Sequence, residues 1–209
     1  MTASPLGSRP DSALAHFELF QRDPLAGMLT LDLLGMVSHL LFVPVILAVY
    51  VSVRRSSEAL AATAVALFVL GVADFLATNT AFPVLSLSAR YAAAVTDADR
   101  AAILAAGEAM FTLFNENAFL VSYVIVSASW ALLGVAMLRS DAFSTRAAWC
   151  GILAGASGIV AVALEHGSPS LVAIAIPVYF GAILFLFAWV LLIAHALIRL
   201  RRRFAAVRE

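Results

Sequence analysis

The sequence predicts an all-α protein, a polytopic helical membrane bundle with five transmembrane helices and short outer cap helices. Of its 209 residues, 63% are hydrophobic and only 12% are charged, and the mean hydropathy is +1.00. Soluble domains carry roughly 25% charged residues, and a soluble domain of this size could not bury so much apolar surface. Several apolar runs also reach the roughly 20 residues that a membrane helix needs. The sequence therefore indicates an integral membrane protein.

The charge and the cysteine content of the chain exclude several kinds of protein. The formal net charge is zero, so the chain lacks the excess of positive charge that would indicate nucleic-acid binding. The partner that we expect is the lipid bilayer. The single Cys150 excludes an intrachain disulfide, and no Cys/His zinc spacing is present. Residues 1–24 contain no apolar stretch typical of a cleaved signal peptide. We therefore expect the first membrane helix to direct insertion.

The predicted transmembrane domain covers residues 25–198. Its five spans are long and apolar, and short polar turns separate them except where the outer cap lies between the second and the third. Their approximate bounds are 25–53, 59–82, 117–138, 147–165 and 171–198. Residues 1–24 are predicted to form an interfacial segment, with a surface-lying helix near 12–22. Residues 199–209 form a basic tail, for which the cytoplasm is expected.

Residues 84–114 are predicted to form an outer cap of two short helices, because their apolar runs are too short to span. Thr96 with Asp99 three residues later matches a capping box, so a helix should begin at Asp97. Two features predict close helix packing inside the membrane. Gly151 and Gly155 form a small-xxx-small pair, which lets helix backbones approach closely. A polar seam recurs every seven residues at Glu108, Asn115, Ser122 and Ser129, which suits a helix-packing partner or a homo-oligomer.

The arginines predict the orientation. With five spans, nine arginines fall on one side, namely Arg54, Arg55, Arg139, Arg146, Arg199, Arg201, Arg202, Arg203 and Arg208, and four fall on the other, namely Arg9, Arg22, Arg90 and Arg100. Positive loops favour the cytoplasm. We therefore expect a multi-pass protein of the inner (plasma) membrane with its N-terminus outside and its C-terminus in the cytoplasm.

The first predicted span carries two unusual polar residues. Asp32 and His39 are spaced i, i+7, which places both on one helical face, and Gly35 between them would leave room for a neighbouring helix. An ionised Asp near mid-membrane costs about 3 kcal/mol on insertion scales. This face should therefore point away from lipid.

The other embedded polar groups fall toward the same predicted outer side. The candidate pocket comprises Asp32, His39, Asp74, Glu116 and His166, and intramembrane ionisable groups are candidates for function. A catalytic site would use Asp74 and Asp32 as general acid or base, with Glu116 in the same pocket. His39 and His166 would then serve as proton shuttle or metal ligands. The sequence identifies no cofactor.

Structural alternatives stand beside each of these roles. Asp32 and Asp74 could share a proton with each other, or accept hydrogen bonds from Ser38 and Thr78, and so fix helix register. His39 could be a core histidine with its own hydrogen bond. Glu116 and Glu165 could be solvated carboxylates at helix ends. HExxH, GxSxG, P-loop and GxGxxG motifs are all absent from the sequence.

Four stretches carry a family resemblance: LDLLGM, ATNTAF, LSARYAAAVTDADRAAILAAGEAM and VAMLRSDAFSTRAAWCGILAG. Through them the chain, from about residue 31 to 155, resembles a bacterial family of small multi-pass membrane proteins known only as a domain of unknown function, number 4386. The resemblance implies an all-helical polytopic fold and assigns no activity or catalytic residue. Many members resemble six-span proteins, whereas this sequence offers five strong spans.

These observations together predict a helical membrane subunit or ligand-binding scaffold with an outward-facing polar intramembrane pocket. The alternative is an intramembrane enzyme that acts on a lipid or a small apolar substrate by carboxylate and histidine acid–base chemistry or by metal chemistry. The sequence alone does not decide between these two classes of protein.

Overall fold

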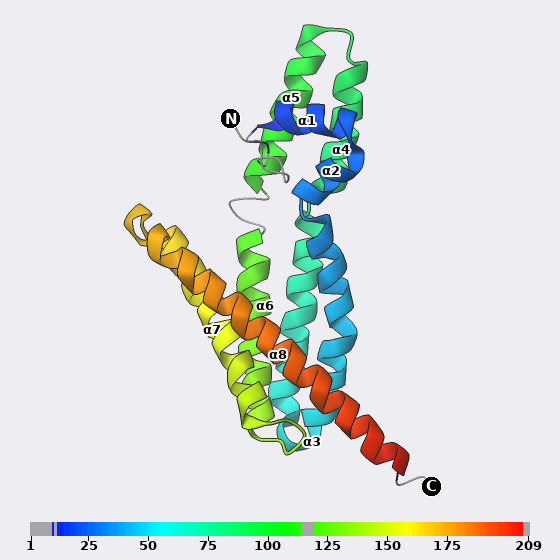
Figure 1. The fold of residues 1–209 in the computed structure, drawn as a ribbon. Helices are drawn as coiled ribbons and strands as arrows, with labels where there is room; N and C mark the ends of the chain where they lie inside the picture. The colour runs from blue at the N-terminus through cyan, green and yellow to red at the C-terminus, as the bar shows by residue number, and fades with distance from the viewer. Residues whose placement is uncertain (1–9, 11, 114–118, 207–209) are drawn as a thin grey trace, which may run out of the picture. The chain divides into compact units, whose positions relative to one another are not determined.

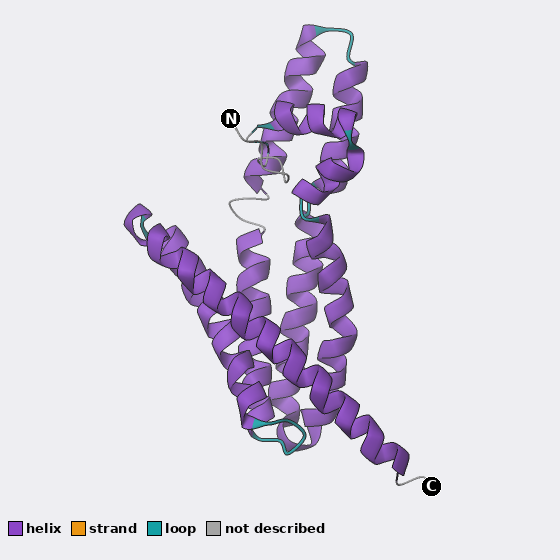
Figure 2. Cartoon of the chain, viewed as in Figure 1, coloured by secondary structure: helices purple, strands orange, loops and turns teal. Residues whose placement is uncertain are grey.

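The computed structural model describes residue 10, residues 12–113 and residues 119–206, and the regular structure in these ranges is entirely helical (Figures 1 and 2). The elements in chain order are α1 (Ala13–Arg22), α2 (Pro24–Thr30), α3 (Leu33–Thr78), α4 (Ala81–Ala93), α5 (Asp97–Leu113), α6 (Phe119–Leu138), α7 (Thr145–Gly167), the 3-10 helix η2 (Pro169–Leu171) and α8 (Val172–Ala206). They divide into two compact units. The first unit contains the described residues of Met1–His39 and Phe75–Phe119, and the second unit those of Leu40–Asp74 and Leu120–Glu209.

Four helical stretches of the described chain are long and apolar enough to cross a membrane. They are Leu33–Ala93, Leu120–Leu138, Thr145–Gly167 and Val172–Arg199. Many of their large apolar side chains are exposed, including Leu184 and Leu191 on α8, which suits contact with lipid rather than water. The prediction of an all-helical integral membrane protein is therefore confirmed.

Helix α3 consists of two halves that fold back on one another at Ser57, whose backbone leaves the helical region (φ −157°, ψ 57°). Figure 1 shows the two halves running side by side. The halves have about 24 and 21 residues, and so lengths of about 36 and 31 Å, each enough for a bilayer core of about 30 Å. The turn falls at the charged run between Arg54 and Glu58, where the sequence predicted the boundary between two spans.

The start of the first predicted span differs from the structure. Residues 25–30 belong to the short helix α2, which Asp23 caps by accepting a hydrogen bond from the backbone N–H of Ala26. Leu31 and Asp32 then interrupt the helix, with Asp32 in the left-handed region at φ 64°. Helix α3 therefore begins at Leu33 rather than at residue 25. The prediction that Asp32 and His39 share one face of one helix was wrong, because Asp32 lies outside the helix that carries His39.

The first unit has a small apolar core formed by α1, α2, α4 and α5. Phe17 and Phe20 of α1 are buried with Val84 of α4 and Phe111 of α5. The apolar face of α1 therefore packs against other helices of its own unit. The sequence correctly predicted a helix near 12–22 and two short helices between 84 and 114, while the membrane-surface position of the first is still a prediction.

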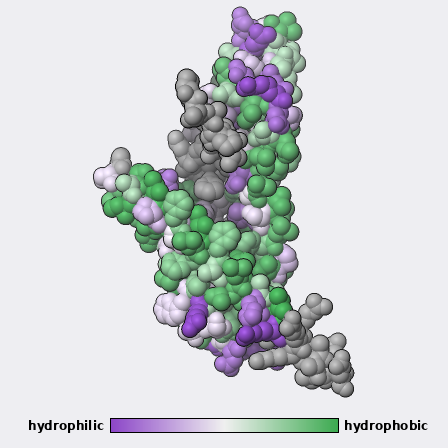
Figure 3. All heavy atoms as spheres, in the orientation of Figure 1, coloured by the Kyte–Doolittle hydropathy of each residue, from purple (hydrophilic) through white to green (hydrophobic). Residues whose placement is uncertain are grey.

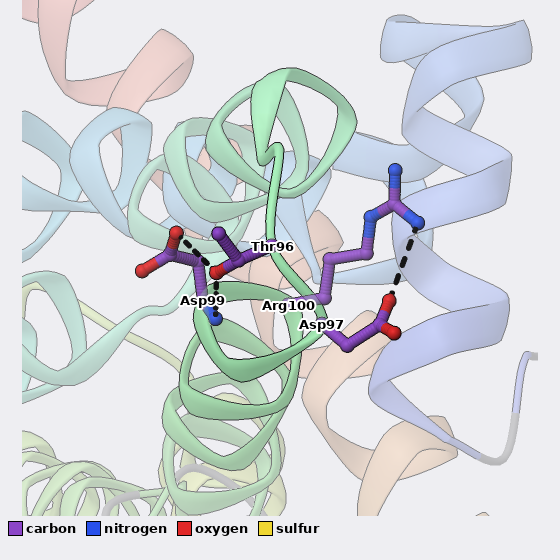
Figure 4. Close-up of polar contacts among 4 residues, drawn as sticks. All are labelled: Thr96, Asp97, Asp99 and Arg100. Carbon is purple, nitrogen blue, oxygen red and sulfur yellow. Dashed lines mark hydrogen bonds and ion pairs between the residues drawn. The ribbon is translucent and has the colours of Figure 1, made fainter.

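The connection between α4 and α5 confirms the predicted capping box (Figure 4). The backbone N–H of Asp99 donates to the hydroxyl of Thr96 over 3.1 Å, and that hydroxyl donates to the Asp99 carboxylate over 2.6 Å. Arg100 lies 3.9 Å from Asp97 in an exposed ion pair. Helix α5 begins at Asp97, as the motif predicted, because the Thr96 hydroxyl satisfies a backbone donor that the helix leaves free.

Glycines bring the helices of the second unit into close contact. A β-carbon added at Gly134 of α6 would lie 2.6 Å from the carbonyl oxygen of Ala148 on α7. One added at Gly155 of α7 would overlap the backbone of α6 at Ser127. Gly151, one turn earlier on α7, faces the indole of Trp189 on α8 instead. The predicted close packing at Gly151 and Gly155 is therefore confirmed, although the two glycines contact different helices.

The remaining boundaries shift by a few residues. Helix α7 begins at Thr145, because the hydroxyl of Ser144 accepts a hydrogen bond from the N–H of Ala147 and so caps it earlier than predicted. Helix α8 continues past Pro177 and through Arg199 to Ala206, so the first part of the predicted basic tail is helical. Residues 114–118, which hold the end of the predicted cap and the start of the predicted third span, lie outside the described part of the chain.

Candidate functional site

Asp32 acts as the N-cap of α3. Its Oδ1 accepts a hydrogen bond from the backbone N–H of Gly35 over 3.1 Å, and the side chain is half-buried. A β-carbon at Gly35 would overlap the Asp32 carboxylate. The glycine therefore makes room for this carboxylate and not, as predicted, for a neighbouring helix. A carboxylate in this position stabilises the helix start by satisfying a free backbone donor and by facing the positive end of the helix dipole.

His39 is held from two sides within the first unit. Its Nδ1–H donates to the carbonyl oxygen of Gly35 over 2.8 Å. Its ring stacks on Phe75 with ring centres 4.5 Å apart and planes 23° apart. Because Asp32 accepts from the N–H of Gly35 and His39 donates to its carbonyl, the two predicted site residues are joined through one glycine.

Asn79 connects the two ends of the α3 hairpin, although no motif in the sequence marks it. Its amide donates to the carbonyl oxygen of Leu31 over 3.0 Å and accepts from the N–H of Ala81 over 2.9 Å. The side chain is 6% exposed. Backbone groups freed by a helix break in an apolar environment need partners, and Asn79 supplies one at each break. A polar residue directly after an apolar run was the only available signal.

The other predicted pocket residues lie elsewhere along the chain. Asp74 is half-buried in the second unit, near the end of α3. His166, also in the second unit, is exposed near the end of α7, and its Nδ1–H donates to the carbonyl of Val162 over 3.1 Å. Glu116 lies outside the described residues. Convergence of Asp32, His39, Asp74, Glu116 and His166 on one pocket therefore stays a prediction.

The metal hypothesis also stays a prediction for His39 and His166, which belong to different units. Within the described ranges, no group of three or more His, Cys, Asp or Glu side chains is close enough together to hold a metal ion. Both histidines use Nδ1 for a carbonyl of their own helix, so a metal would have to bind Nε2.

A second polar cluster joins three helices of the second unit. The hydroxyl of Tyr179 on α8 donates to Oε2 of Glu165 on α7 over 2.7 Å. The Tyr179 ring lies 5.9 Å from that of Tyr123 on α6, at 55°. The sequence indicated only a solvated carboxylate at a helix end for Glu165, because residues 14 positions apart on two helices show no local pattern.

Residues of the predicted polar seam bind other helices of the same chain. Glu108 of α5 accepts a hydrogen bond from the N–H of Ala13 over 2.8 Å, which satisfies the start of α1. Ser129 of α6 donates to the carbonyl of Ala64 in α3 over 2.7 Å and is fully buried. Ser122 is buried as well, and Asn115 lies outside the described residues. The seam therefore contacts helices of the same chain.

Comparison with known families gives a match over residues 12–201 to the family described as Domain of unknown function (DUF4386). The chain belongs to this family. The match covers nearly all of the described helices, from α1 to α8, and confirms the resemblance seen in the sequence. Comparison with curated proteins and with solved structures gives no match. This DUF4386 chain is an integral membrane protein, and its family assigns it no activity.

Proposed function

We propose that this DUF4386 chain is a helical subunit or scaffold of the plasma membrane. The observation that carries the proposal is the use of Asp32 and His39, the first two candidate site residues, to fix the entry of α3 through Gly35. Hydrogen bonds to the local backbone and an aromatic stack hold these side chains, and they thereby position the start of the helix. Positioning helices is what a scaffold requires of its side chains. The enzyme alternative gains no support from the comparisons and stays a prediction.

The arginines of the second unit support the topology expected of such a subunit. The α3 turn, with Arg54 and Arg55, and the α6–α7 loop lie at one end of this unit, and the connection between α7 and α8 lies at the other (Figure 1). Figure 3 shows hydrophilic surface gathered at the end with the turns, beside the hydrophobic flank of the helices. We therefore propose five crossings, since each half of α3 can span the bilayer, with this arginine-rich end in the cytoplasm.

Native mass spectrometry of the full chain in a mild detergent tests the scaffold role. A scaffold should appear in complexes heavier than the 22.1 kDa monomer, either with itself or with co-purified membrane proteins. A chain that stays monomeric and brings no partner through purification would contradict the proposal. Elemental analysis of the same sample tests the metal chemistry of the enzyme alternative, because a stoichiometric transition metal would favour it over a scaffold.

A further inference from the structure

A groove of about 700 Å³ lies at the arginine-rich end of the second unit. The α6–α7 loop lines one side with Asp141 and Phe143, and the first turn of α7 adds Arg146 to that side. The C-terminal part of α8 lines the other side with Leu192, His195 and Arg199. Phe143 is 7% exposed, so a buried aromatic side chain anchors the loop in this unit. The groove is thus built entirely from one compact unit.

The groove carries more positive than negative groups. Arg146 and Arg199 supply two guanidinium groups and His195 a ring N–H donor, against the single carboxylate of Asp141. Within the described residues, neither arginine forms an ion pair, since the salt bridge found there joins Arg100 to Asp97. Guanidinium groups match the geometry of phosphate oxygens, which they bind with paired N–H donors.

An apolar face of α8 leads into the groove. Leu184, Leu191 and His195 lie at i, i+7 and i+11, within about 40° of one another around the helix. Leu184 is 70% exposed and Leu191 69% exposed, while His195 lines the groove. A ligand that matches both parts needs an anionic head and a long apolar tail, which is the chemistry of an anionic lipid. Basic pockets at the cytoplasmic ends of membrane helices bind such head groups.

We propose that this groove binds the phosphate head group of an anionic membrane lipid through Arg146 and Arg199, with the acyl chains along the exposed face of α8. The site goes beyond a general attraction of arginines to the membrane, because the loop and α8 form one concave surface around the head group. Only the choice of leaflet depends on the proposed topology, and the binding itself does not.

The test measures lipid binding to the full chain by native mass spectrometry, with phosphatidylglycerol and phosphatidylcholine of identical acyl chains as probes. The wild type should retain phosphatidylglycerol in preference to phosphatidylcholine. The double variant Arg146→Gln/Arg199→Gln should lower phosphatidylglycerol retention about tenfold, since two charge-assisted contacts are lost, and leave phosphatidylcholine unchanged. The matched control Arg54→Gln/Arg55→Gln removes the same charge at the same end outside the groove, and should change retention less than about twofold.

Equal losses in the groove and control variants would overturn the proposal in favour of a general charge effect. Glycerol phosphate, which has the head group without chains, separates a lipid from a free phosphate. If it protects the protein against thermal unfolding as well as phosphatidylglycerol does, the lipid assignment is wrong. If the double variant elutes as aggregate, the single variant Arg199→Gln replaces it. It should lose about threefold in retention relative to Arg54→Gln, and no difference between the two would contradict the site.

Discussion

At the residue scale, several polar side chains bind backbone groups where a membrane helix begins, breaks or packs. Asp32 caps the start of α3, Asn79 binds both ends of the α3 hairpin, and Ser129 donates to a carbonyl of α3 from α6. Backbone donors and acceptors have no water to bind inside a bilayer, and each unsatisfied one costs several kcal/mol. A polar residue in an apolar run is thus explained wherever it supplies such a partner.

Substitutions at Asp32 separate a cap from a functional charge. Asp32→Ala should lower the free energy of unfolding by about 1 kcal/mol, because the N–H of Gly35 loses its acceptor. Asp32→Asn should stay close to the wild type, since Asn caps helices equally well and tolerates a left-handed backbone. Thermal unfolding in detergent measures both variants. An Asn variant as unstable as the Ala variant would show that the charge itself matters, and would favour the pocket hypothesis.

At the element scale, the sequence predicted features whose signal is local. The capping box at Thr96 and Asp99 set the start of α5, and the spacing of Gly151 and Gly155 predicted close helix contacts. The break at Leu31 and Asp32 was missed, because hydropathy continues through both sides of it and Asp32 read as a buried charge. An Asp followed by a glycine at i+3 can be recognised as a helix cap only when the backbone conformation of the Asp is known.

The glycines of α7 and α8 make a matched pair of tests. Gly155→Ala should destabilise the protein by about 1–3 kcal/mol, because the new methyl group overlaps the α6 backbone at Ser127 and forces the helices apart. Gly181→Ala is the control, since no atom lies within 4 Å of its added β-carbon. It should be neutral or stabilise α8 by up to about 1 kcal/mol. Equal melting temperatures for the two variants would contradict close α6–α7 packing.

At the scale of the whole molecule, composition was enough to predict membrane insertion and helical structure. Five apolar runs were also visible, and the fold-back of α3 at Ser57 explains why two of them appear within one continuous helical stretch. The candidate site was less accessible to sequence reasoning. Hydrogen bonds such as that between Tyr179 and Glu165 join residues of separate helices, and a single sequence records spacing along each helix but not the pairing between helices.

The proposed topology predicts which loops are reached from each side of the membrane. Ala98 is exposed at the start of α5, and Ser140 lies in the loop after α6. In a variant with Cys150→Ser, a cysteine at Ala98 should react with an impermeant maleimide added outside intact cells. A cysteine at Ser140 should react only after the membrane is opened, because its loop belongs to the arginine-rich end. A green fluorescent protein fused after Glu209 should fluoresce, as it does in the cytoplasm. Two results would contradict this topology and indicate an even number of crossings or the opposite orientation. One is labelling of both cysteines from the outside. The other is a fluorescent fusion that stays dark while a periplasmic phosphatase fused at the same site is active.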